Sequence, residues 1–459
     1  MDLKNKRVLV VGLGKSGVAS ALFLQERGAR VTVSDAKAED ELSGHIPQLL
    51  DKGITVESGG HGERTFRGQD LIVVSPGVPV DVPQLAQART QGVPVIGEIE
   101  LAARFLKGHI VAITGSNGKT TTTALAGEII GWGGYESLVG GNIGNPAISL
   151  VAEATDDSYI VLEVSSFQLE TIETFHPEIA VVLNITPDHL DRHHTFEAYV
   201  AAKSRIFENQ AGSDFAVLNA DDPTCATLGA RTEAQKVWFS RKKEVEQGAF
   251  VRNGQILWRA EGSEREIMPV AEIGLKGAHN LENVLAAICV GSLVRCEPHR
   301  IRKAVQEFKA VEHRLEFVAT INGVDYYNDS KATNVDATIK ALESFAGNIH
   351  VILGGKDKGS DYSVLNDLLR QRVKRVYTIG AAAQKIESQV AGSTEIVQAE
   401  TLDTAVRRAA ASAKPGDIVL LAPACASFDQ FENYEHRGRV FKEIVQSLAA
   451  HAPVPGGAA

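Results

Sequence analysis

The chain has 459 residues, a length typical of about three domains. Its 47 Lys and Arg residues against 57 Asp and Glu residues give a net charge of −10, which argues against a nucleic-acid partner. No apolar run approaches about 18 residues, and the first residues lack a signal-peptide layout, so we expect a cytoplasmic protein without a membrane span. No cysteine has metal-binding spacing, and buried, reduced thiols are expected at Cys225, Cys289, Cys296 and Cys425.

The N-terminal stretch predicts a strand, a glycine turn and a helix that suit a nucleotide diphosphate. A strand is expected at residues 7–11, then the glycine turn Gly12–Gly17, then a helix over residues 18–27. A second strand at residues 31–34 ends at Asp35, where the dinucleotide-binding pattern places an acid. The pattern fits any nucleotide diphosphate, NAD included, and a purely structural turn is the alternative.

A further strand of this first domain ends in a second glycine loop. The expected strand covers residues 71–74, and Ser75-Pro76-Gly77 follows it at the same edge of a parallel sheet. Residues 93–97 then lead out of the domain. We therefore place the first domain at residues 1–98.

The stretch around residue 115 predicts a phosphate-binding loop. An apolar strand at residues 110–113 runs into Gly115–Gly118, Lys119 and Thr120, and a helix follows. The glycines let backbone N–H groups approach phosphate oxygens, Lys119 adds a charge, and Thr120 offers a hydroxyl to Mg²⁺. Ile113 stands where the full pattern has its first glycine, so this is a shortened GxxGKT loop, with an incidental turn as the alternative. The expected ATP-binding residues of this loop are Gly115, Ser116, Asn117, Gly118, Lys119, Thr120 and Thr121.

An acidic residue follows the phosphate-binding loop at the end of a buried strand. Residues 140–146 form a polar glycine turn before a helix, and the strand at residues 159–163 ends in Glu163. A carboxylate at the end of a strand beside a phosphate-binding loop is placed to hold Mg²⁺, directly or through water. Glu163 is therefore a candidate metal ligand.

Histidines gather after the next expected strand, at residues 179–185. His189 and His193 lie four residues apart in a loop that also holds Asp188, which raises the alternative of a zinc site. Pro187 predicts a loop and not a helix, so the two histidines need not share a face. One histidine at a Mg²⁺–phosphate centre is the favoured interpretation, and a polar loop whose histidines cap helices is the other alternative.

Lys203 lies on a helix expected over residues 196–209. A lysine on such a helix usually faces solvent, so the residues alone predict a surface position. Short β-like runs then alternate with charged turns from about residue 237 to residue 268, before a helix in which apolar residues recur with helical spacing from Leu281.

A third domain is expected to begin near residue 313. Its strands at residues 324–328, 350–354, 375–379 and 417–421 end in polar or glycine loops, which predicts another parallel sheet with ligand loops at its carboxyl edge. The fold class is α/β with three domains: Rossmann-like at 1–98, a central P-loop ATPase domain at 99–312, and Rossmann-like at 313–459. A disordered tail is expected at residues 451–459.

Nine motifs in order resemble those of one enzyme family. They are TGSNGKTTT, GGNIGNP, EVSSFQLE, NITPDHLDRH, GAHNLEN, EHRLE, NDSKATN, LGGKDKG and APACASFDQFENYEHRG. Together they resemble the Mur ligases, the ATP-dependent amino-acid-adding enzymes of peptidoglycan synthesis, nearly from end to end. The variants EVSSFQLE, NDSKATN and ACASFDQF resemble the D-glutamate-adding branch most.

The resemblance implies substrates, a mechanism and site residues. The substrates would be UDP-N-acetylmuramoyl-L-alanine, D-glutamate and ATP, joined through an acyl-phosphate intermediate by a monomeric enzyme with two Mg²⁺ ions. The UDP-substrate would be bound by Gly14, Ser16, Asp35, Ser75, Gly77 and Asn142, in place of NAD. Further ATP contacts would come from Asn280, Arg314 and Asp329. D-glutamate would be bound by Thr333, Lys358, Ser427 and Phe428.

The resemblance also reverses the surface interpretation of Lys203, which falls at the family's carbamylated lysine. Carbamylation turns an ammonium into an anionic metal ligand, so Lys203 would help to hold a second Mg²⁺ with His189, while Thr120 and Glu163 serve the first. The implied catalytic residues are Lys119, Glu163, His189 and Lys203.

Several alternatives stay open from the sequence. Another Mur ligase would differ mainly around Thr333, Lys358 and Ser427. A folate polyglutamate ligase would share the chemistry but lack the N-terminal nucleotide domain with Asp35. An NAD-dependent oxidoreductase, or a non-catalytic ATP switch, would belong to a different class of protein.

Overall fold

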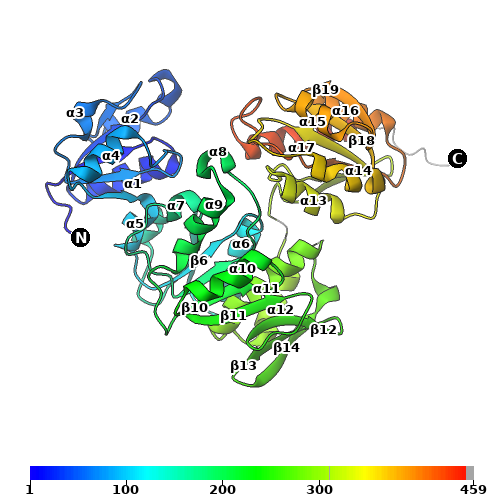
Figure 1. Cartoon of the computed structure of the whole chain (residues 1–459), viewed down its shortest axis with the longest axis horizontal. Helices are drawn as coiled ribbons and strands as arrows, with labels where there is room; N and C mark the ends of the chain where they lie inside the picture. The colour runs from blue at the N-terminus through cyan, green and yellow to red at the C-terminus, as the bar shows by residue number, and fades with distance from the viewer. Residues whose placement is uncertain (276, 310, 451–459) are drawn as a thin grey trace. The chain divides into compact units, whose positions relative to one another are not determined.

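Figure 1 shows the computed structural model, which describes residues 1–275, 277–309 and 311–450. The tail predicted at residues 451–459 lies outside the described residues. Three β-sheets succeed one another along the chain, as the α/β fold class predicts. The contacts divide the chain into two compact units, and each is described by itself. The first holds Met1–Ile185, Thr195–Glu272 and Glu282–Glu307, and the second holds Thr186–His194, Ile273–Leu281 and the chain from Phe308 onward.

The first unit begins with a five-stranded parallel sheet in the order β3-β2-β1-β4-β5. Its strands are β1 Arg7–Val11, β2 Arg30–Ser34, β3 Thr55–Glu57, β4 Leu71–Val74 and β5 Val95–Gly97. Its helices are α1 Lys15–Glu26, η1 Asp40–Leu42, α2 Ile46–Leu50, α3 Glu63–Phe66, α4 Pro83–Thr90 and α5 Glu98–Ala103.

Alternating side chains of these strands fill two separate cores. Val8 and Val10 of β1 pack in one core with α1 and α2, whereas Leu9 and Val11 pack on the other face with α3 and α4. Burial on both faces explains why the strands read as continuous apolar runs. The first core continues through α5 into the next sheet, so the two sheets of this unit share one hydrophobic core.

The second sheet has nine strands in the order β14-β13-β12-β11-β10-β9-β6-β8-β7. The strands are β6 His109–Thr114, β7 Ser137–Gly141, β8 Tyr159–Glu163, β9 Ile179–Val182, β10 Phe215–Asn219, β11 Gln235–Ser240, β12 Gly248–Arg252, β13 Gln255–Ala260 and β14 Ser263–Pro269. The helices are α6 Lys119–Trp132, η2 Ala147–Ala152, α7 Ser166–Leu169, α9 Phe196–Ser204, η3 Arg205–Phe207, α10 Pro223–Leu228, η4 Gly229–Arg231, η5 Val270–Glu272, α11 Ala278–Leu293 and α12 Pro298–Glu307.

The second unit contains the third sheet, in the order β15-β16-β20-β17-β18-β19. Its strands are β15 Glu316–Ile321, β16 Val324–Asn328, β17 Ile349–Gly354, β18 Val373–Ile379, β19 Glu395–Glu400 and β20 Ile418–Leu421. Its helices are α8 Leu190–His193, α13 Val335–Glu343, η6 Ser363–Leu365, α14 Asn366–Arg372, α15 Ala383–Val390, α16 Leu402–Ser412 and α17 Tyr434–Ala450. Helices α13, α14 and α15 cover one face, and α16 and α17 cover the other.

The fold differs from the prediction in three ways. The second sheet is not wholly parallel, because β12–β14 extend it as an antiparallel meander where the sequence predicts only short β-like runs and charged turns. The third sheet is not wholly parallel either, since β15 pairs antiparallel with β16. The loop expected after β9 contains one helical turn, α8, despite Pro187.

Two expectations from composition can be compared with the described residues. All four cysteines are free and buried, as predicted. Within residues 1–275, 277–309 and 311–450, every helix is too short or too polar to cross a bilayer.

Candidate functional site

The phosphate-binding loop joins β6 to α6, as the sequence predicts. Gly118 forms the N-cap of α6 in the left-handed region, with φ of +84°, and Gly115 has φ of +153°. A Cβ atom on Gly118 would lie 2.1 Å from Oδ1 of Asn283, so glycine is required there. The loop therefore brings backbone N–H groups to the positive end of α6, where an anion is stabilised.

Two lysines donate hydrogen bonds to one carbonyl oxygen of this loop. Nζ of Lys119 lies 2.8 Å from O of Gly115 and 2.9 Å from O of Ser116. Nζ of Lys203 lies 2.8 Å from the same oxygen of Gly115 and 3.3 Å from Oγ1 of Thr114. Lys203 is only 1% exposed, so the surface position predicted from the residues alone is wrong. Its helix α9 faces the loop rather than the solvent at this residue.

Glu163 accepts hydrogen bonds from a predicted metal ligand and from a predicted UDP-substrate residue. Oγ1 of Thr120 donates to Oε2 of Glu163 at 2.7 Å, and Nδ2 of Asn142 donates to Oε1 at 2.8 Å. Glu163 itself is 1% exposed. A hydroxyl and a buried carboxylate offer the hard oxygen ligands that Mg²⁺ prefers, so the donor set fits this ion.

Two residues without a predicted role hold the phosphate-binding loop in place. Asn184 accepts from the N–H groups of Ser116 and Asn117 with its backbone and side-chain oxygens, at 2.9 and 2.8 Å. The hydroxyl of Tyr199 lies 3.0 Å from Oγ of Ser116. Asn184 belongs to the motif NITPDHLDRH, but the motif alone gave no reason to single it out.

The N-terminal turn is closed by its own side chains. Asp35 accepts from the N–H of Leu13 at 2.6 Å and from the N–H of Lys37 at 2.8 Å. Oγ of Ser75 donates to O of Gly12 at 2.8 Å. A Cβ atom on Gly17 would lie 1.8 Å from that same oxygen, which explains the third glycine of the pattern.

A hollow of about 530 Å³ lies between α1 and the segment that follows β7. Lys15, between the predicted substrate residues Gly14 and Ser16, lines it together with Gly144 and Asn145. Gly14, Ser75 and Gly77 follow the carboxyl ends of β1 and β4, where open parallel sheets bind ligands. The hollow is lined by neighbours of Gly14, Ser16 and Asn142 but by none of the six predicted substrate residues, so their shared role stays a prediction.

In the second unit, an ion pair occupies the predicted D-glutamate site. Nζ of Lys358 lies 3.1 Å from Oδ1 of Asp188, and Nδ2 of Asn334 donates to Oδ2 at 2.9 Å. Thr333 directly precedes Asn334. Burial acts to raise the pKa of Asp188, but the charges of Lys358 and His189 and the hydrogen bonds from Asn334 and Lys358 outweigh it and hold this pKa well below its usual range.

The loops carrying Lys358 and Ser427 run side by side. Lys356 and Ala426 form a β-bridge between them. The buried Arg437 donates to O of Cys425 at 3.1 Å and to O of Ser330 at 2.8 Å, and so ties this loop to the one after β16. Ser427 is buried, whereas Phe428 is 67% exposed.

The remaining predicted ATP contacts also belong to the second unit. Oδ1 of Asp329 accepts from the N–H of Leu315 at 3.2 Å. Burial raises the pKa of Asp329 to about 6, against the opposing charge of Arg314. Asn280 is buried in the first turn of α11, and burial lowers the pKa of its neighbour His279 to about 4, with the charges of Lys340 and Arg314 acting in the same direction.

His189 belongs to this second unit, in a left-handed conformation with φ of +54°. The zinc alternative for His189 and His193 gains no support. Among the described residues, the side chains that could share a metal ion are Glu312, His313 and Glu316. Lys442 pairs with both of those carboxylates, which makes them an ion-pair cluster.

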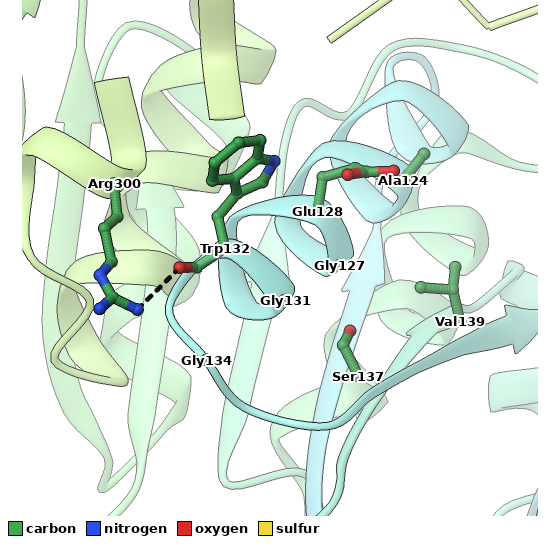
Figure 2. Close-up of a pocket in the computed structure, with 9 residues that line it drawn as sticks. All are labelled: Ala124, Gly127, Glu128, Gly131, Trp132, Gly134, Ser137, Val139 and Arg300. Atoms are coloured by element: carbon green, nitrogen blue, oxygen red, sulfur yellow. Dashed lines mark hydrogen bonds between the residues drawn. The ribbon is translucent and has the colours of Figure 1, made fainter. Parts of the chain in front are cut away.

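A second hollow lies along the exposed face of α6, away from the predicted site. It has a volume of about 680 Å³, and Figure 2 shows its lining, with Arg300 donating to O of Trp132 at 3.2 Å. It is lined by Ala124, Gly127, Glu128, Gly131, Trp132, Gly134, Ser137, Val139 and Arg300. None of the predicted site residues is among them.

Comparison with known protein families gives three matches, one for the segment that forms each sheet. Residues 6–97 match the family Mur ligase MurD-like, N-terminal domain; residues 113–291 match Mur ligase middle domain; residues 313–425 match Mur ligase, glutamate ligase domain. A UDP-N-acetylmuramoylalanine–D-glutamate ligase of Koribacter versatilis is 68% identical over 98% of this chain and 99% of its own. The chain belongs to the Mur ligase family.

Other Mur ligases agree with this assignment. The UDP-N-acetylmuramoylalanine–D-glutamate ligase of Acidobacterium capsulatum is 61% identical, with 97% of each chain covered. The solved UDP-N-acetylmuramate-alanine ligase of Thermotoga maritima has a TM-score of 0.60 at 22% identity, over 96% of this chain and all of the other. At that identity the likeness shows the shared fold. The NAD-dependent oxidoreductase interpretation is therefore wrong, while the domain boundaries and the roles of single residues stay predictions.

Proposed function

We propose that this Mur ligase joins the amino group of D-glutamate to the alanyl carboxylate of UDP-N-acetylmuramoyl-L-alanine, with ATP converted to ADP and phosphate. The observation that carries the proposal is the phosphate-binding loop, with Lys119 and Lys203 on the oxygen of Gly115 and Thr120 on Glu163. The full-length identity of 68% to a ligase of that name supports the choice of amino acid.

The first step is attack by the alanyl carboxylate on the γ-phosphate of ATP. A carboxylate must approach a polyanion, so neutralising charge is the main requirement. Lys119 and the N-terminus of α6 supply fixed positive charge at the loop. Thr120 and Glu163 would hold Mg²⁺, which when bound supplies further neutralisation of the phosphate oxygens. The product is an acyl phosphate, and ADP leaves.

The second step is attack by the amine of D-glutamate on the acyl carbon, which releases phosphate. We assign the binding of D-glutamate to Thr333, Lys358, Ser427 and Phe428. Lys358 carries the charge that a substrate carboxylate needs, and that carboxylate must compete with Asp188 for it. Asp188 thus keeps the charge of Lys358 paired while the site awaits substrate.

We further propose that Lys203 is carbamylated. Lys203 is buried, and its Nζ shares the oxygen of Gly115 with Nζ of Lys119, so the two nitrogens lie close together at the loop. In carbamylation the neutral Nζ attacks the carbon of CO₂, one N–C bond forms, and one proton leaves the nitrogen for water. The resulting carbamate would be an anionic oxygen ligand for a second Mg²⁺, with His189 assigned to the same ion.

Carbamylation predicts a carbon signal that depends on Lys203. Enzyme equilibrated with ¹³C-bicarbonate should show one carbamate resonance by NMR, and Lys203→Arg should lose it. Lys119→Arg is the matched control, because Lys119 donates to the same carbonyl oxygen, and it should keep the signal. Lys203→Ala should be inactive and regain activity with short carboxylates. A wild-type spectrum without the resonance contradicts carbamylation.

The proposed function is tested by phosphate release from ATP in the presence of UDP-N-acetylmuramoyl-L-alanine. We expect release with D-glutamate and not with L-glutamate, L-alanine, L-lysine or diaminopimelate. Release with another amino acid would keep the mechanism and overturn the assignment of the pocket. We also propose a monomer as the active unit, which light scattering of the active enzyme checks.

A further inference from the structure

Helix α5 connects the first sheet to the second and carries two buried glutamates, Glu98 and Glu100. They are 1% and 0% exposed, and both accept hydrogen bonds from backbone N–H groups of the second sheet's connections. The first hydrophobic core continues through this helix. Helix α5 therefore packs in the core that the two sheets of the first unit share. Its two glutamates accept hydrogen bonds from different segments.

Glu98 reaches the segment that carries Asn142. Its Oε1 accepts from the N–H of Ile148 at 2.8 Å, at the start of η2. Its Oε2 is buried and has no hydrogen-bond partner among the described residues. An apolar side chain at this position would leave the N–H group of Ile148 without its acceptor.

The segment between β7 and η2 connects the residue held by Glu98 to Glu163, the candidate metal ligand. The N–H of Gly141 donates to O of Asn145 at 2.8 Å and closes the turn. The N–H of Asn142 donates to O of Glu163 at 2.9 Å, and its Nδ2 donates to Oε1 of Glu163 at 2.8 Å. A Cβ atom on Gly141 would lie 2.4 Å from O of Glu163, so the turn and β8 are in close contact. One end of the turn is thus fixed by Glu163 and the other by Glu98.

We propose that Glu98 is a positioning residue, which fixes the turn 141–147 so that Asn142 meets both Glu163 and the UDP-substrate. The proposal rests on the proposed function, because it takes Asn142 as a substrate contact. In this proposal, hydrogen bonds within the first unit connect helix α5, which follows the first sheet, to Glu163, the candidate Mg²⁺ ligand.

The acid–base behaviour of Glu98 supplies an independent signature. Burial raises the pKa of Glu98 to about 7, against the opposing backbone N–H groups of Ile148 and Ala147. No charged side chain of the described residues contributes to this shift. Because the pKa is higher in the folded state, Glu98 contributes stability that is complete below its unfolded pKa of about 4.5 and is lost as the pH rises through about 7.

Glu100 is the matched control on the same helix. It accepts from the N–H groups of Glu173, Thr174 and Phe175 and pairs with Arg104 at 2.8 Å. Residues 173–175 carry no predicted site residue. Burial acts to raise the pKa of Glu100, but these hydrogen bonds outweigh it and lower the pKa, so its contribution to stability is lost toward acid and not toward neutral pH.

The experiment compares Glu98→Met, Glu98→Gln and Glu100→Gln in the full-length enzyme. Methionine fills a similar volume without an acceptor, so Glu98→Met should raise the KM for the UDP-substrate by about fivefold or more, with the KM for ATP changed less than about twofold. Glu98→Gln keeps the acceptor and should restore the wild-type KM. Glu100→Gln should lower the melting temperature without changing the KM for the UDP-substrate.

Melting temperatures from about pH 5 to about pH 8 give the second readout. The wild type should lose more stability over this range than Glu98→Gln, in which the group no longer titrates. An unchanged KM in Glu98→Met, or an equal rise in Glu100→Gln, would overturn the positioning role. An inactive wild type would contradict the proposed function instead, and the pH dependence of melting would still test the buried acid.

Discussion

The N-terminal turn and the phosphate-binding loop share a backbone design but differ in charge. In each, a buried parallel strand ends in glycines, and a helix begins with a lysine: Lys15 at α1 and Lys119 at α6. Lys15 is exposed, whereas Lys119 donates to the carbonyl oxygens of Gly115 and Ser116. Each loop has a buried carboxylate, Asp35 or Glu163, but only the second of the two has a buried lysine, Lys203.

In our assignment, one backbone arrangement serves two tasks. The first turn is closed by Asp35 and Ser75, which accept from and donate to its own backbone. Such a turn can hold a diphosphate that does not react. The second loop adds the charges that a transferred phosphate needs. In our assignment both loops bind phosphate groups, and the charges at the second loop determine where the reaction takes place.

Lys119→Ala should give the largest effect. It removes the cation closest to the reacting phosphate in our assignment, and loss of one such group typically costs about 10²–10³ in rate. Steady-state kinetics with saturating substrates should show the loss mainly in kcat. Near-normal turnover would contradict the assignment of chemistry to this loop.

Asp35→Asn should give an intermediate effect on binding. The amide keeps one acceptor for the backbone but loses the charge that would bind hydroxyl groups of the UDP-substrate, so we expect a rise of about tenfold in its KM. The kcat should stay within about threefold of wild type. A fall in kcat comparable with that of Lys119→Ala would break the division between the two loops.

Lys15→Ala should give the smallest effect and is the matched control for Lys119→Ala. Lys15 occupies the same first helical position but is exposed, and an exposed charge contributes little. We expect a change of less than about threefold in the KM for the UDP-substrate, measured by titration of that substrate. A loss of about 10² would show that the first turn also carries a reactive charge.

The sequence predicts most of the fold because buried parallel strands and glycine loops leave strong local signals. The run at residues 110–113 and the glycines after it identify β6 and the start of α6 directly. The sequence does not predict strand β19, since its polar residues are half-exposed at a sheet edge and alternate weakly. The sequence analysis does not predict β15 either, and its antiparallel direction depends on its pairing with β16, which no local pattern encodes.

Site residues divide in the same way. Gly115 and Lys119 follow from spacing, because a phosphate needs both at fixed positions in one loop. The residues alone predict the wrong position for Lys203, since an amphipathic helix does not reveal which of its lysines is buried. Asn184 and Arg437 were missed because each holds loops that are distant in sequence. Such contacts become visible only after the strands have assembled.

The most direct test follows oxygen from the UDP-substrate into phosphate. UDP-N-acetylmuramoyl-L-alanine labelled with ¹⁸O in the alanyl carboxylate is incubated with ATP, Mg²⁺ and D-glutamate, and the released phosphate is analysed by mass spectrometry. Attack of the carboxylate on the γ-phosphate predicts one ¹⁸O atom in each phosphate. Unlabelled phosphate accompanying the amide product would contradict the acyl-phosphate mechanism at this loop.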